Sequence, residues 1–168
     1  GIELIDTLLK SNFRVLLRPH FRILRDSKKL IDSIKDKFRK NPNFIFEDDV
    51  IPSKYFHNSV CMISDWSGIS MEYAFTCECS VIFIDVPKKI LNPDANDLSL
   101  EPIEISLRNK IGHIVSPENI ENIPTIIKNF ENDIPNFSQQ IKEIRANIVF
   151  NVGNSAPVGA KYIQNLVS

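Results

Sequence analysis

The residues best suited to chemistry lie in one short stretch, Asp65-Trp66-Ser67-Gly68, which is followed one helical turn later by Glu72. A serine hydroxyl and the free amides of a turn can bind a phosphate, and a glycine lets the phosphate approach the backbone. The carboxylate of Glu72 can accept hydrogen bonds from ribose hydroxyls. The spacing therefore indicates a nucleotide site. An ordinary helix start, capped by the side chain of Asp65 or Ser67, accounts for the same residues without a ligand.

The flanking sequence places this turn between a strand and a helix. Residues 60–63 form an apolar run long enough for a buried strand, and helical spacing begins at Ile69. This order directs the unpaired amides of the first helical turn toward a ligand. Residues 81–86, which form a continuous apolar run, predict a central parallel strand. Trp66 is expected to pack against its surroundings rather than stack on a base.

The rest of the chain alternates strands and helices. Further strands are predicted at 13–17, 44–46 and 111–115, and helices at 2–9, 27–39, 118–132, 138–148 and 157–167. Residues 101–108 fit either a short helix or a loop, and 88–97 an irregular loop. The alternation predicts an α/β fold in one domain over 1–168, a doubly wound parallel sheet of at least five strands. The carboxyl ends of such strands share one edge, so His20 is expected to face Ser67.

Composition narrows the class of protein. Apolar residues make up 43% of the 168 residues, and 20 basic residues balance 21 acidic ones, so we expect a soluble domain without a broad nucleic-acid surface. No apolar run approaches the length of about 20 residues that a membrane span needs, and no secretory signal opens the chain. A cytoplasmic location is expected. The closely spaced Cys77 and Cys79 and the dispersed histidines predict no metal site.

The turn and the helix that follows resemble the nucleotide-binding turn in the C-terminal domain of GT-B sugar-nucleotide enzymes, through the string Asp65-Trp66-Ser67-Gly68-Ile69-Ser70-Met71-Glu72. The resemblance is strongest to the CDP-glycerol glycerophosphotransferases of teichoic acid and capsule synthesis, in which an Asp–aromatic–Ser–Ser turn follows a strand. Arg18-Pro19-His20 and the segment 151–156 resemble the same enzymes. UDP-N-acetylglucosamine 2-epimerases, with a Ser/Gly-rich turn and a helix Glu, are the alternative. Gly68 stands where the glycerophosphotransferase turn has its second Ser.

The resemblance implies a Rossmann-like fold, the GT-B C-terminal half, that binds a CDP- or UDP-linked donor and needs neither a further cofactor nor a metal. It implies that Ser67 and Gly68 bind the diphosphate within the turn that Asp65 begins, and that Glu72 binds the ribose. His20 is then the catalytic candidate, contacting a phosphate or assisting the leaving group. Arg18 neutralises phosphate charge, or else pairs with Glu47.

The implied reaction moves glycerol phosphate or a sugar to a cell-surface polysaccharide or lipid-linked acceptor. Because the sequence begins with Gly rather than Met, we expect a segment excised from a longer enzyme, whose missing N-terminal part holds the acceptor and the general base. The isolated chain is therefore expected to be inactive, and the full-length protein can associate peripherally with the inner face of the membrane.

Two other classes of protein remain open from the sequence. The first is a non-catalytic domain that keeps the fold without the activity. The second is a receiver-like signalling domain, for which Glu47-Asp48-Asp49 would supply acidic residues. A receiver needs an acidic pair after its first strand, whereas here the first strand is followed by Arg18-Pro19-His20, which carries the opposite charge.

Overall fold

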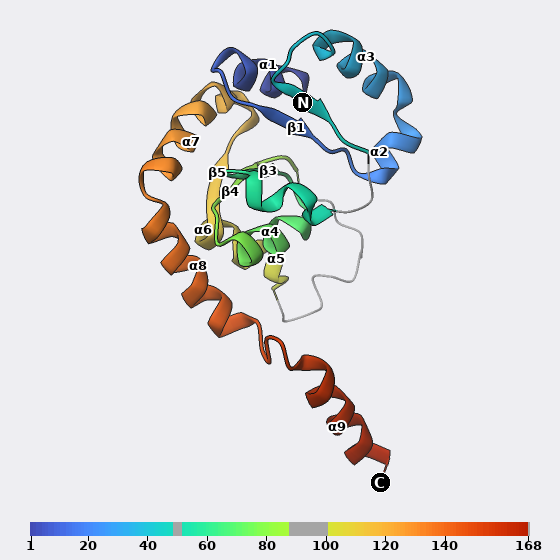
Figure 1. The fold of residues 1–168 in the computed structure, drawn as a ribbon, viewed down its shortest axis with the longest axis vertical. Helices are drawn as coiled ribbons and strands as arrows, with labels where there is room; N and C mark the ends of the chain where they lie inside the picture. The colour runs from blue at the N-terminus through green and yellow to red at the C-terminus, as the bar shows by residue number, and fades with distance from the viewer. Residues whose placement is uncertain (49–51, 88–100, 168) are drawn as a thin grey trace.

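The computed structural model describes residues 1–48, 52–87 and 101–167, which form a mixed α/β fold (Figure 1). The strands are β1 (Val15–Leu17), β2 (Phe44–Phe46), β3 (Met62–Ser64), β4 (Val81–Ile84) and β5 (Gly112–Val115). The α-helices are α1 (Ile2–Lys10), α2 (Phe21–Asp26), α3 (Lys28–Phe38), α4 (Ile69–Cys77), α5 (Ile103–Ser106), α6 (Arg108–Ile111), α7 (Ile123–Asn132), α8 (Ile134–Ile148) and α9 (Ser155–Val167). Two 3-10 helices are η1 (Pro52–Asn58) and η3 (Pro117–Asn122). The loop expected at 88–97 lies outside the described residues.

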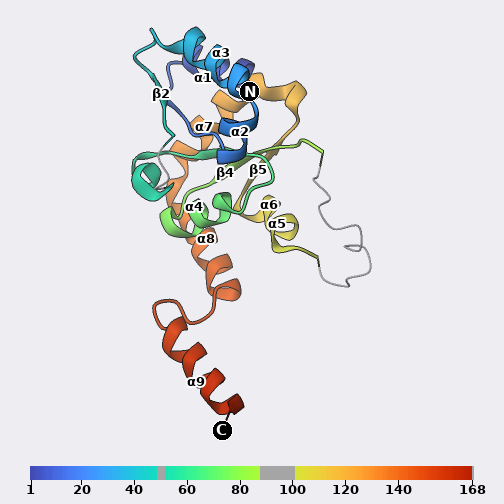
Figure 2. The same ribbon diagram turned by 90° about the vertical axis from the view of Figure 1, so that its right-hand side faces the viewer.

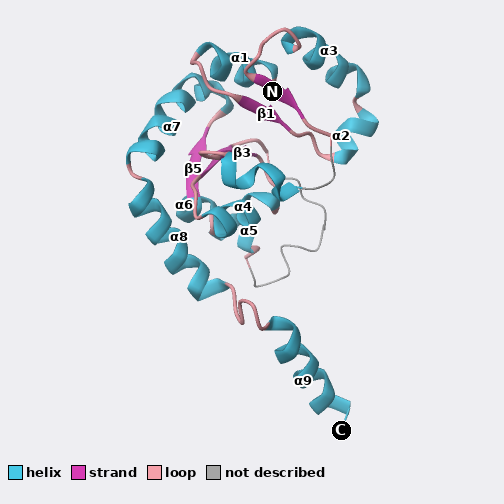
Figure 3. Ribbon diagram, viewed as in Figure 1, coloured by secondary structure: helices cyan, strands magenta, loops and turns pink. Residues whose placement is uncertain are grey.

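All strand pairs in the described ranges are parallel, as the alternating pattern predicted. The prediction of one continuous sheet is wrong, because the strands divide into a pair, β1-β2, and a three-stranded sheet, β3-β4-β5 (Figure 3). The strands β1 and β3 are each three residues long and share no ladder. Side-chain packing joins the two sheets instead, since Val15 of β1 belongs to the same apolar cluster as Ile63 of β3.

The strand β4 is central to the three-stranded sheet, and its successive side chains enter two different cores. Val81 and Phe83 pack in the cluster formed with α4 and α6, whereas Ile82 packs in the cluster formed with α1 and α7. Helices therefore cover both faces of this sheet, as Figure 2 shows for α7 on one side and α4 on the other. The continuous apolar run that predicted a buried parallel strand is explained by this double coverage.

Several element boundaries differ from the sequence-based expectations. The short helix α2 was not predicted, and the side chain of His20 caps its start. The helix α8 begins at Ile134 rather than at residue 138, since Pro135 lies in its first turn, where a missing N–H is tolerated. The segment predicted as one helix over 118–132 is a 3-10 helix followed by α7. The ambiguous segment 101–108 contains α5 and the start of α6.

The last helix, α9, extends away from the rest of the chain (Figures 1 and 2). None of its residues is buried, and its apolar side chains Tyr162, Ile163, Leu166 and Val167 are exposed. Among the described helices, none combines the length and the apolar character that crossing a bilayer requires.

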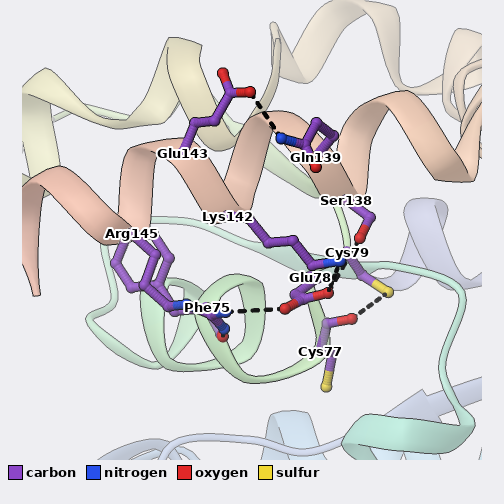
Figure 4. A network of polar contacts seen from close by, with 9 residues as sticks. All are labelled: Phe75, Cys77, Glu78, Cys79, Ser138, Gln139, Lys142, Glu143 and Arg145. Carbon is purple, nitrogen blue, oxygen red and sulfur yellow. Dashed lines mark hydrogen bonds and ion pairs between the residues drawn. The ribbon is translucent and has the colours of Figure 1, made fainter. Parts of the chain in front are cut away.

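A polar network fixes α8 against the C-terminal end of α4 (Figure 4). Glu78, which ends α4 in the left-handed conformation, receives hydrogen bonds from Arg145 at 2.9 Å and from Ser138 at 3.1 Å. Lys142 approaches the same carboxylate to 3.1 Å, and Arg145 also donates to the carbonyl of Phe75. These cations lie where the partial negative charge of the helix end attracts them.

This network predicts a pH-dependent contribution of Glu78 to stability. Burial raises the pKa of Glu78, but hydrogen bonds from Lys142, Ser138 and Arg145 lower it by more. The pKa of Glu78 therefore lies below its ordinary value of 4.5. A carboxylate with a lowered folded pKa contributes stability above its unfolded pKa and loses that contribution as the pH falls through the folded pKa. We expect Glu78→Gln to lower the free energy of unfolding by roughly 0.5–1 kcal/mol at pH 7, and by less at pH 3.

Urea unfolding at both pH values measures this difference. Glu121→Gln is the matched control, since it removes an exposed carboxylate for which the described structure records no ion pair. Equal stability of Glu78→Gln and the parent protein at pH 7 would contradict the prediction.

Candidate functional site

The helix α4 follows the carboxyl end of β3 after the turn Asp65-Trp66-Ser67-Gly68, and no side chain caps it. Gly68 occupies the N-cap position with φ −60° and ψ −24°, and the structure has no side-chain hydrogen bond there. The expected alternative, a cap made by the side chain of Asp65 or Ser67, is therefore wrong. Ser67 contributes its carbonyl instead, which accepts a 2.7 Å hydrogen bond from the hydroxyl of Ser70. The amide of Ser70 bonds to this same carbonyl at 3.2 Å and the amide of Met71 to the carbonyl of Gly68 at 3.0 Å. In the described structure the amides of Ser67, Gly68 and Ile69 have no recorded acceptor, and these are the donors that the helix start leaves available.

Space is open above this helix start. Gly68 is exposed, and a Cβ added to it would meet no atom within 4 Å. Its backbone conformation is one that any residue adopts. The fold itself therefore does not require a glycine at this position, and the open space is available to a ligand that approaches the amides.

Glu72 lies in the first turn of α4, where its amide bonds to the carbonyl of Gly68 at 3.3 Å. Its side chain is exposed. The structure therefore keeps Ser67, Gly68 and Glu72 together at one end of a single helix, as their spacing predicted. A carboxylate here can accept hydrogen bonds from hydroxyls of a ligand held at the helix start.

Trp66 packs into the protein, as expected, rather than facing solvent. Its indole Nε1 donates to the carbonyl of Val86, just beyond β4, at 2.8 Å. The guanidinium carbon of Arg108 lies 3.8 Å from the centroid of the indole ring. The turn that precedes α4 is thus attached to the end of the neighbouring strand and to α6.

Arg108 is the site residue that sequence reasoning missed. Helical spacing alone would pair it with Glu104 four residues earlier, but its partners are Asp85 Oδ1 and the carbonyl of Ile84, each at 3.3 Å. Only 4% of Arg108 is exposed, and its Nε is buried without a hydrogen-bond partner in the described structure. The signal that could have indicated this contact is Asp85, a charged residue that directly follows the most apolar strand.

A small cavity of about 10 Å³ lies between the turn and α6. It is lined by Asp65, Ser67, Ser70, Glu104 and Arg108 together with apolar side chains. This volume is at the lower limit for one water molecule. The cavity therefore leaves no room for a nucleotide, whose place has to be the open surface at Gly68.

The structure gives His20 a structural contact. Its Nδ1 accepts a 3.3 Å hydrogen bond from the amide of Arg22 and thereby caps α2, and its ring lies 4.3 Å from that of Phe21. The side chain is exposed, and its recorded contacts in the described chain stay within this helix start. Because β1 and β3 share no ladder, the argument that brought His20 to the edge with Ser67 loses its main support.

The other residues after the first two strands are less informative. Arg18 follows β1 and is partly buried. Glu47, the carboxylate expected as its alternative partner, accepts a hydrogen bond from the hydroxyl of Tyr55 at 2.7 Å. Of the acidic string that a receiver-like domain would use, Asp49 lies outside the described residues.

Burial shifts the pKa of all three thiols, those of Cys61, Cys77 and Cys79, above its ordinary value. For Cys61 the pKa rises to about 12. A raised pKa keeps a thiol protonated and therefore weakly nucleophilic. Within residues 1–48, 52–87 and 101–167, no three His, Cys, Asp or Glu side chains are grouped so that they could hold a metal ion.

A search of protein-family models, curated proteins and solved structures finds no match for this chain.

Proposed function

We propose that this chain is the donor-binding domain of a GT-B transferase similar to the CDP-glycerol glycerophosphotransferases. In this proposal its fold is a doubly wound GT-B C-terminal half, and its ligand is a CDP- or UDP-linked donor. The observation that carries the proposal is the start of α4, which follows a parallel strand, lacks a side-chain cap and has open space above Gly68. Such a helix start attracts an anion through its free amides and its partial positive charge.

Different residues at this helix start bind the diphosphate and the ribose. The amides at Ser67 and Gly68 and the Ser67 hydroxyl bind the diphosphate, and Glu72 accepts hydrogen bonds from the ribose. Asp65 belongs to the turn that holds these groups, although its own charge is unfavourable for a phosphate. His20 and Arg18 remain proposed phosphate contacts that depend on the ligand reaching β1.

In this proposal the domain supplies the donor half of the reaction. The acceptor, a polysaccharide or a lipid-linked molecule, is held by a further domain, so residues 1–168 alone are expected to bind the donor without transferring its group. Turnover of CDP-glycerol or a sugar nucleotide by the isolated chain would contradict this division.

Binding measurements test the assignment of Glu72. Glu72→Ala is expected to weaken the binding of CDP or UDP by about 1–3 kcal/mol, the range of a hydrogen bond to a charged group, and to leave pyrophosphate binding nearly unchanged. The reason is that Glu72 is assigned to the ribose, which pyrophosphate lacks. Isothermal titration with CMP, CDP, UDP and pyrophosphate measures both effects.

The control for this experiment is Glu121→Ala, which removes an exposed carboxylate outside α4 and is expected to bind all ligands like the parent protein. Absence of nucleotide binding by the parent protein would reject the proposed function. Equal affinities of Glu72→Ala and the parent would reject the ribose assignment alone.

A further inference from the structure

Three separate segments meet at Arg108. The residue begins α6, its ring neighbour Trp66 belongs to the β3–α4 turn, and its polar partners Ile84 and Asp85 lie at the end of β4. The guanidinium also lies 5.2 Å from the ring centroid of Phe83. One buried cation therefore contacts the turn of the proposed site and the neighbouring strand at the same time.

The contacts of Trp66 give its indole one defined position. Its N–H is held by the carbonyl of Val86 at 2.8 Å, and its face is covered by the guanidinium of Arg108 at 3.8 Å. The planar guanidinium stacks on an aromatic face, which the ammonium group of a lysine cannot do in the same way. Because Trp66 directly precedes Ser67 and Gly68, fixing the indole also restricts the backbone that presents their amides.

The size of the neighbouring cavity decides between a direct and an indirect role for Arg108. The guanidinium is almost fully buried, and the cavity that it lines measures about 10 Å³. A phosphate is several times larger than the water molecule that such a space can hold at most. Arg108 therefore acts through Trp66 rather than by touching the ligand.

We propose that Arg108 is a positioning residue of the nucleotide site, which holds the turn Asp65-Trp66-Ser67-Gly68 in its binding conformation by stacking on Trp66. The ligand part of this inference rests on the proposed function. The positioning part concerns the turn itself and can be measured without any ligand.

The decisive variant is Arg108→Lys, which keeps the positive charge beside Asp85 and removes the planar stack on Trp66. We expect amide hydrogen exchange at residues 70–72, whose amides bond to the carbonyls of Ser67 and Gly68, to become several-fold faster, with exchange in α7 unchanged. Trp66 is the single tryptophan of the chain, so acrylamide quenching of its fluorescence is expected to increase as well. Affinity for CDP or UDP is expected to fall by about twofold to thirtyfold, which corresponds to the loss of one cation–π contact.

Arg145→Lys is the matched control, because Arg145 contacts the opposite end of α4. It is expected to leave exchange at 70–72 and the Trp66 fluorescence as in the parent protein. A second variant, Trp66→Phe, keeps an aromatic face and removes the indole N–H. A third variant, Trp66→Leu, loses the hydrogen bond to Val86 as well as the aromatic face that Arg108 covers. Exchange in the same turn is therefore expected to be faster in Trp66→Leu than in Trp66→Phe, because the two variants differ in the aromatic face.

The possible outcomes separate the two proposals. Unchanged exchange at 70–72 in Arg108→Lys overturns the positioning role, and so does an equal increase of exchange throughout the chain, which is the sign of a general loss of stability. If Arg108→Lys does not fold, equal exchange in Trp66→Leu and Trp66→Phe overturns the positioning role instead. If the parent protein binds no nucleotide, the proposed function fails, and exchange in the ligand-free protein still decides the role of Arg108.

Discussion

Replacing Gly112 with alanine is expected to remove much of the protein's stability. Gly112 is the first residue of β5 and pairs with Val81 of β4. A Cβ at this position would lie 2.0 Å from the carbonyl oxygen of Val81, 2.8 Å from its carbonyl carbon and 3.0 Å from the ring of Phe83. Since two of these atoms belong to the backbone of a buried strand, a side-chain rotation cannot relieve the clash.

The expected loss is at least about 3 kcal/mol, the upper range for overpacking a core, because β4 would have to move away from β5. Gly112 has φ −173°, an extended conformation open to any residue, so the effect is steric and not conformational. Urea unfolding followed by circular dichroism measures it. Gly159→Ala in the exposed helix α9 is the matched control, since nothing lies within 4 Å of its added Cβ. A Gly112→Ala protein that unfolds at the parent's midpoint would show that β4 and β5 do not pair as described.

The parts of the fold that the sequence predicted are those with a strong local pattern. The continuous apolar run at β4 required a strand covered on both faces, and the helical stripes at α1 and α3 required amphipathic helices. The separation of β1-β2 from β3-β4-β5 has no such local signature. It depends on hydrogen bonds between strands that are distant in sequence, and with three-residue strands a small displacement is enough to break the ladder.

The same distinction, between features set by nearby residues and features set by residues distant in sequence, applies to the candidate site. Ser67, Gly68 and Glu72 are close in sequence on one helix start, so their proximity follows from helical geometry alone. Arg108 contacts the indole ring of Trp66, which lies 42 positions earlier in the chain, whereas helical spacing favours Glu104 as its partner. The position of His20 relative to Ser67 depended on a continuous sheet edge, which is the part of the architecture that periodicity cannot determine.

In the proposed site, replacing Gly68 with valine is expected to weaken nucleotide binding at least about tenfold while leaving the protein folded. The added Cβ would meet no protein atom within 4 Å, and the backbone has φ −60°, so the folded state accommodates the side chain. We expect the free energy of unfolding to change by less than about 1 kcal/mol, since valine is a poorer N-cap residue than glycine but restricts the unfolded chain. The two methyl groups would instead fill the space through which a phosphate approaches the amides.

The size of the effect on binding follows from the contacts that the valine blocks. A hydrogen bond to a charged group contributes about 1.5–3 kcal/mol, so losing even one amide contact corresponds to a decrease in affinity of roughly tenfold or more, and losing two to at least a hundredfold. Titration with CDP, UDP and pyrophosphate measures this loss. Unlike Glu72→Ala, Gly68→Val is expected to weaken pyrophosphate as strongly as the nucleotides, because it acts on the diphosphate.

Gly68→Ser is the matched control for the valine variant. It places a Cβ at the same position but adds a hydroxyl that can donate to a phosphate, and it creates the Asp–aromatic–Ser–Ser turn of the glycerophosphotransferases. We therefore expect Gly68→Ser to bind diphosphates at least as well as the parent, whereas Gly68→Val does not. If the parent binds and both variants bind equally well, the ligand does not approach the start of α4, and the diphosphate has to be assigned to another part of the chain.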